Sequence, residues 1–82
     1  LPEYSAIVDN GIFIRNAVLK HDISDKTIRK IKRLVSDKNP MPITHAPIGT
    51  IALAALDVLG IQPYKGENQF VHYYKEMFSS YE

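Results

Sequence analysis

The sequence has no cysteine, and no apolar run in it comes near the length of a membrane span. Without cysteine there is neither a disulfide framework nor a thiolate metal site, which suits a reducing compartment and favours an intracellular location. The longest apolar run, residues 51–56, ends at Asp57, whereas a membrane-spanning helix needs roughly 18 such residues. These absences predict a soluble chain that does not enter a membrane.

Recognisable catalytic and metal-binding patterns are also missing. A catalytic site needs a nucleophile beside a base, paired carboxylates or converging metal ligands. His21, His45 and His72 have no second His or Cys at ligand spacing. Gly49 stands alone, whereas phosphate-binding loops need several glycines and a lysine, so we expect Gly49 to permit close helix packing instead. We therefore expect no enzyme activity, no cofactor and no metal.

Length and composition predict one helical domain over residues 1–82. The 45% share of hydrophobic residues excludes a disordered chain. A chain of this size buries roughly 60–65% of its unfolded surface, so its stability is marginal and a homo-oligomer would add to it. The chain begins Leu-Pro-Glu-Tyr rather than with Met, and we expect it to be a fragment of a longer protein.

Apolar residues recurring at helical spacing predict an all-α bundle of about four helices. The first three cover about residues 3–20, 24–37 and 48–59, and the fourth carries the aromatic stripe within residues 70–81. Residues 39–47, with three prolines, predict an extended connector. An α+β fold with a short N-terminal β-hairpin is the alternative, because Asp9-Asn10-Gly11 lies between two apolar triplets. The predicted shared core contains Ile31, Val35, Ile51, Ala55, Leu59, Phe70, Tyr74 and Phe78.

Residues 24–37 concentrate the positive charge of the chain on one predicted helix. Its start is well specified, since Ser24 or Asp22 can act as the N-cap. Ile28, Ile31 and Leu34 share one face of the helix. The opposite face carries four cationic side chains that we take as candidate nucleic-acid contacts, and two more flank them in the sequence. The six candidates are Lys26, Arg29, Lys30, Arg33, Lys20 and Lys38.

The charge is segregated although the whole chain is nearly neutral. Residues 15–38 contain eight Lys or Arg against three carboxylates, a local net charge of +5. Because the whole chain carries +1, the remaining residues carry −4. Such a basic patch can attract a polyanion. A charged face that only keeps the helix soluble would have the same composition, so composition does not distinguish the two interpretations.

The segment from Ile23 to Ile31 resembles the turn and recognition helix of a helix-turn-helix unit. A hydrophobic-Ser pair opens the helix, and Thr27-Ile28 follows three residues later. The resemblance departs from the usual pattern at Asp22, where a turn glycine is expected, and at His21, where leucine is usual. Aspartate tolerates the left-handed backbone that such a turn requires.

Two functions follow from these patterns. The first is binding of nucleic acid, with DNA favoured, through the basic helix of residues 24–37. The second is a helical protein–protein interaction or oligomerisation module, which would dock on an acidic protein surface or on itself.

Overall fold

The computed structural model describes residues 2–81, with side chains described from residue 4 onward. It contains four helices, α1 (Pro2–Lys20), α2 (Asp25–Leu34), α3 (Ile48–Val58) and α4 (Gln69–Ser79), and no strand within residues 2–81. The all-α prediction is confirmed. The alternative N-terminal hairpin is wrong, because Asp9-Asn10-Gly11 lies inside α1.

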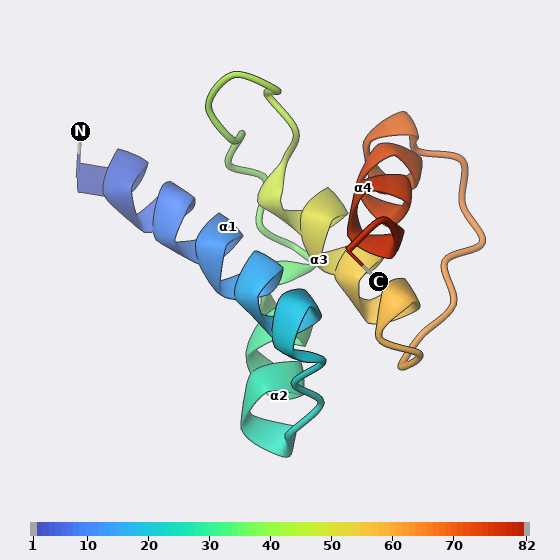
Figure 1. Ribbon diagram of the computed structural model, residues 1–82. Helices are drawn as coiled ribbons and strands as arrows, with labels where there is room; N and C mark the ends of the chain where they lie inside the picture. Colours follow the sequence, from blue (N-terminus) through green and yellow to red (C-terminus); the bar gives the residue numbers. More distant parts are fainter. Residues whose placement is uncertain (1, 82) are drawn as a thin grey trace.

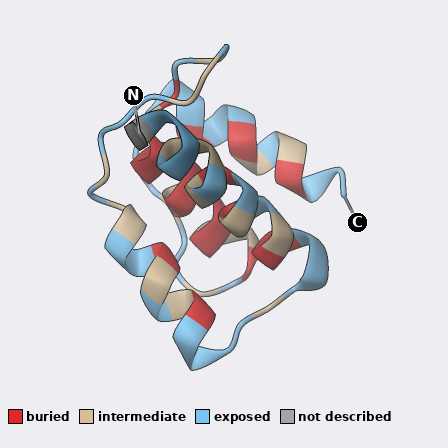
Figure 2. Ribbon diagram, turned by 90° about the vertical axis from the view of Figure 1, so that its left-hand side faces the viewer, coloured by how far each residue is buried: buried red, intermediate tan, exposed pale blue. Residues whose placement is uncertain are grey.

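Helix α3 lies at the centre of the molecule, and each of the other three helices packs against it. Figure 1 shows α1 and α2 on one side of α3 and α4 on the other. Figure 2 shows buried residues gathered where the helices face one another, with exposed residues on their outer faces. The core is formed by Ile14, Ala17, Val18, Ile31, Ala46, Ile48, Ile51, Ala52, Ala54, Ala55, Leu56, Leu59, Val71, Tyr74 and Phe78.

Two of the eight predicted core residues differ from the prediction. Phe70 is 38% exposed, and Val35 is only half-buried. The buried face of α4 contains Val71, Tyr74 and Phe78, and Phe70 lies about 100° away from Val71 around the helix. The remaining six residues are buried as expected.

Helix α2 ends at Leu34, three residues before its predicted end. Proline at position 40 restricts only the residue before it, so the earlier end needs another cause. The backbone carbonyl of Asp37 accepts a hydrogen bond from the Gly49 amide at 2.8 Å. A Cβ at Gly49 would collide with the backbone carbonyl oxygen of Val35. The segment after α2 therefore packs against the start of α3 instead of continuing the helix. Gly49 permits this close approach, as predicted.

Residues 39–47 form a closed loop rather than the extended connector that the prolines predict. Pro40 and Pro47 form an isolated antiparallel bridge, and the Met41 amide donates to the Ala46 carbonyl at 2.8 Å. The Thr44 and Tyr74 hydroxyls lie 3.2 Å apart and share a hydrogen bond, which fixes the loop to α4. The prolines prevent a helix in this segment, as predicted. The turn that closes the loop depends on contacts with the rest of the fold, which the sequence pattern does not show.

Candidate nucleic-acid interface

The turn between α1 and α2 closes the first helix with a left-handed residue. His21 has φ 50°, and its amide donates to the Val18 carbonyl at 3.1 Å. The Asp22 amide donates to the Ala17 carbonyl at 2.8 Å, so the two bonds form a Schellman motif. The left-handed position is thus His21 and not Asp22, and histidine is among the residues that adopt it most readily.

Asp22 instead joins the N-terminal cap of α2. Its carboxylate accepts hydrogen bonds from the Ser24 amide at 3.0 Å and from the Thr27 hydroxyl at 2.8 Å. The Ser24 hydroxyl accepts from the Thr27 amide at 3.4 Å, so Ser24 is the N-cap residue. Hydrogen bonds to the charged carboxylate, foremost from the Ser24 backbone, lower the pKa of Asp22 below its ordinary 3.8. These bonds fix the start of α2, whose outer face carries the candidate contact residues.

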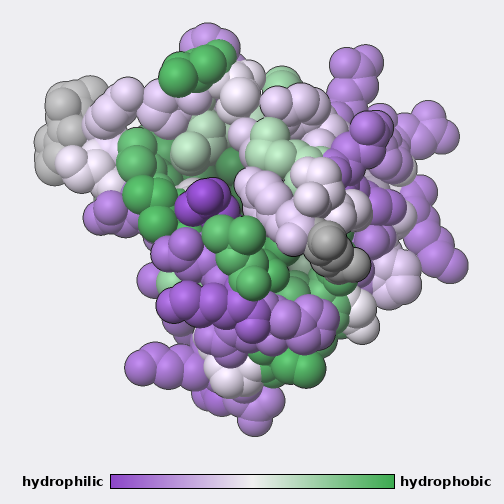
Figure 3. Space-filling view, viewed as in Figure 1, coloured by the Kyte–Doolittle hydropathy of each residue, from purple (hydrophilic) through white to green (hydrophobic). Residues whose placement is uncertain are grey.

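Three of the predicted contact residues lie together on that outer face. Lys26, Arg29 and Arg33 are exposed and line one shallow hollow of about 330 Å³. Their spacing of three and four residues aligns them along about 10 Å of the helix axis. That length is comparable with about three base-pair steps of a duplex, at roughly 3.4 Å each. Figure 3 shows hydrophilic side chains over much of the lower end of the molecule, where α2 lies, with an apolar patch beside them.

Lys30 does not join this group. Its Nζ lies 4.1 Å from the centroid of the Phe13 ring on α1, in a cation–π contact. Lys30 therefore links α2 to α1 and lies beside the group of Lys26, Arg29 and Arg33, not within it. No sequence pattern indicated Phe13 as a partner of Lys30, because only the fold brings these two residues together.

The two flanking lysines are also separate from the group. Lys20 lies at the end of α1, in a smaller hollow that Asp22 and Thr27 also line. Lys38 is exposed in the segment after α2. Lys32, which was not among the six candidate contacts, is exposed on α2 as well.

The three grouped cations have no carboxylate partner among the described side chains. In residues 4–81 one ion pair is formed, between Lys75 Nζ and Asp57 Oδ2 at 3.2 Å, and it links α3 to α4. The acidic residue nearest the start of α2, Asp25, occupies the first helical turn, where it favours the positive helix end. The charge of Lys26, Arg29 and Arg33 thus remains available to an anion from outside.

Two other features are absent from the described part of the chain. No three His, Cys, Asp or Glu side chains in it are grouped so that they could hold a metal ion. None of its helices combines the length and the apolar character that crossing a membrane requires. Comparisons of the chain with protein-family models, curated proteins and solved structures gave no match.

Proposed function

We propose that this protein binds nucleic acid, with duplex DNA favoured, through the outer face of α2. The observation that carries the proposal is the group of Lys26, Arg29 and Arg33 around one exposed hollow, without a carboxylate partner among the described side chains. In the proposed complex these three side chains contact phosphates, and Lys20 and Lys38 add to the field at the margins.

The connection between α1 and α2 supports a docking mode of the helix-turn-helix kind. Four residues, 21–24, separate the two helices, within the range of turn lengths that such units use. In this mode α2 approaches the major groove, and α1 crosses the phosphate backbone. The contact residues on α2 are all Lys or Arg, the residue types that neutralise phosphates, so we expect phosphate contacts to outnumber contacts to base edges. We therefore expect affinity to depend on salt more than on base sequence.

The test is a titration of the protein into a labelled 20-base-pair duplex, followed by fluorescence anisotropy at several salt concentrations. Three neutralised phosphates predict a log–log slope of about −2.7. If Lys30 leaves the Phe13 ring on binding and contacts a fourth phosphate, the slope becomes about −3.6. The slope thus reports how many phosphates are neutralised, and a Lys30→Gln variant that restores a slope of about −2.7 would identify Lys30 as the fourth contact.

Charge reversal identifies the face that binds. Arg29→Glu should weaken duplex binding by about tenfold or more, since a charge-assisted contact is lost and a repulsive one gained. The double variant Arg29→Glu, Arg33→Glu should lose measurable binding while it keeps the helical circular dichroism of the wild type, because both side chains are exposed. Lys65→Glu is the matched control: it changes the net charge equally at an exposed loop position and should have little effect.

Two results would contradict the proposal. If the wild type binds neither duplex nor single strands at low salt, the basic face serves another partner, and an acidic protein surface becomes the leading one. If Arg29→Glu and Lys65→Glu weaken binding equally, only net charge matters and α2 is not the contact face.

A further inference from the structure

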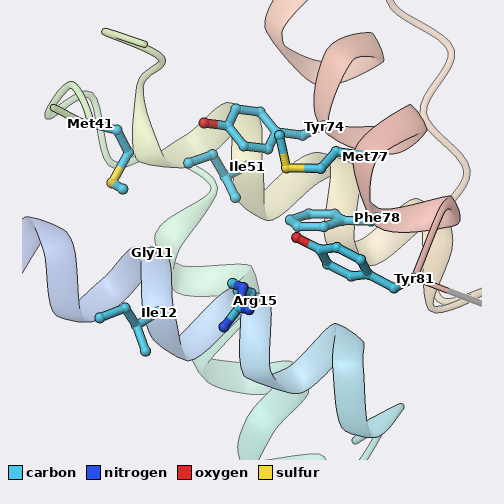
Figure 4. A pocket seen from close by; sticks show the side chains of 9 residues that line it. All are labelled: Gly11, Ile12, Arg15, Met41, Ile51, Tyr74, Met77, Phe78 and Tyr81. Atoms are coloured by element: carbon cyan, nitrogen blue, oxygen red, sulfur yellow. The ribbon is translucent and has the colours of Figure 1, made fainter. Parts of the chain in front are cut away.

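A second candidate site lies on a different face, between α1 and α4. Both helices pack on α3 and only lightly against each other, which leaves a cavity of about 140 Å³ above α3. The cavity is lined by Ile12 of α1, Met41 of the closed loop, Ile51 of α3, and Met77 and Phe78 of α4 (Figure 4). None of these residues belongs to the proposed nucleic-acid interface.

The cavity suits a small hydrocarbon group. An apolar protein cavity of about 150 Å³ is large enough to hold benzene. Its two methionines can adapt to the shape of an occupant, because methionine is unbranched and polarizable. Gly11 leaves room for the Met41 side chain, whose end lies 2.9 Å from the position that a Cβ at Gly11 would take.

One charged side chain, Arg15, lies among the residues that line the cavity. Among the described side chains no carboxylate lies within ion-pair distance of Arg15. Figure 4 shows the hydroxyl of Tyr81, which follows the end of α4, directed toward α1 on the side of the cavity where Arg15 lies. A guanidinium group presents a fork of donors that matches a carboxylate, and a tyrosine hydroxyl can donate to the same group.

We propose that this cavity binds a small amphiphilic carboxylate, namely an aryl or alkyl carboxylic acid. Its hydrocarbon group, about the size of a phenyl ring, enters between α1 and α4, and its carboxylate meets Arg15 at the rim. The apolar walls supply burial of the hydrocarbon, and the positive charge of Arg15 selects the acid over a neutral compound of the same shape.

The two methionines of the chain, Met41 and Met77, both line the cavity, so their methyl groups can report binding by NMR. With ¹³C-methyl methionine, an NMR spectrum shows one signal from the loop side of the cavity and one from α4. The probes are 3-phenylpropionate and its neutral analogue 3-phenylpropionamide. We expect both methionine signals to shift in a saturable way with either probe, and the acid to bind about three- to fivefold more tightly than the amide.

The Arg15→Gln variant tests the source of the preference. Arg15 is exposed, so the fold should not depend on it. The variant should bind acid and amide equally, at the level of the amide with the wild type. Arg33→Gln is the matched control, because it removes the same charge from α2 and should keep the preference for the acid.

Three results would overturn the inference: shifts that do not saturate, equal affinity for acid and amide in the wild type, or a preference that persists in Arg15→Gln. The nucleic-acid proposal stands or falls separately, because Arg15→Gln should retain duplex binding and Arg33→Gln should weaken it.

Discussion

Helices α3 and α2 are of similar length but are held in the fold in different ways. Eight of the 11 residues of α3 are buried, whereas in α2 only Thr27 and Ile31 of ten are. Burial around most of its circumference fixes α3. By contrast, α2 is held by its cap, by the buried Thr27 and Ile31, by the contact of Lys30 with Phe13 and by the close approach of its C-terminal end to Gly49. This difference leaves the outer face of α2 free to carry charge at little cost to folding.

The largest effect on stability is expected in the interior of α3. Ile51 is 3% exposed, and Ile51→Ala removes buried hydrocarbon and leaves a cavity that the neighbouring helices can close only partly. We expect the free energy of unfolding to fall by about 2–5 kcal/mol, measured by chemical denaturation.

The same truncation at Ile43 is the control, because its side chain is 92% exposed at the tip of the closed loop. Ile43→Ala should not lower stability. A loss at Ile51 below about 0.5 kcal/mol would mean that α3 is not held by burial, and the contrast with α2 would disappear.

A somewhat smaller effect is expected where the two helices meet. Gly49→Ala adds a methyl group that collides with the Val35 carbonyl, and a backbone group cannot move aside as a side chain can. We expect a loss of about 2–3 kcal/mol in the free energy of unfolding.

Gly11→Ala provides a matched comparison within α1. The added methyl there meets only the flexible end of Met41, and alanine is the better helix former, so stability should change by no more than about 1 kcal/mol. Equal losses for the two variants would show that the approach of α2 to Gly49 is looser than the structure has it.

The sequence predicted the elements that local pattern decides. The predicted bounds of α3, residues 48–59, agree with Ile48–Val58 because Pro47 precedes the apolar run and Gly60 follows it. Gly60 has φ 78°, the left-handed conformation expected of a residue that ends a helix. The start of α2 was also predictable, because Ser24 and Asp22 are both capping residue types and both take part.

What the sequence could not predict depends on contacts between elements. The early end of α2 results from docking on Gly49, and the position of Lys30 results from Phe13, which lies on another helix. Helical phase placed Lys30 with the other cations because phase describes one helix at a time. The cavity beside Arg15 could not be predicted from the sequence for the same reason, since α1, α3, α4 and the closed loop all contribute to it.

The smallest expected effect concerns the cap of α2, and its sign depends on pH. Asp22 has a lowered pKa in the folded protein because its charged form accepts hydrogen bonds from Ser24 and Thr27. A lowered folded pKa adds stability above the unfolded pKa, and this contribution is lost as the pH falls through the folded value. Asp22→Asn should therefore be less stable than the wild type at pH 7, by less than either loss expected at α3.

The pH dependence separates a charge effect from a change of shape. Chemical denaturation of both proteins from pH 7 to pH 2.5 should show the difference shrinking below about pH 4, where the Asp22 carboxylate of the unfolded chain takes up a proton, and vanishing once the pH has fallen through the lower pKa of the folded protein. A difference that stays constant over this range would mean that the charge of Asp22 contributes nothing to the cap. In that case the start of α2 would rest on Ser24 and on burial of Thr27, and α2 would resemble α3 more closely than the structure indicates.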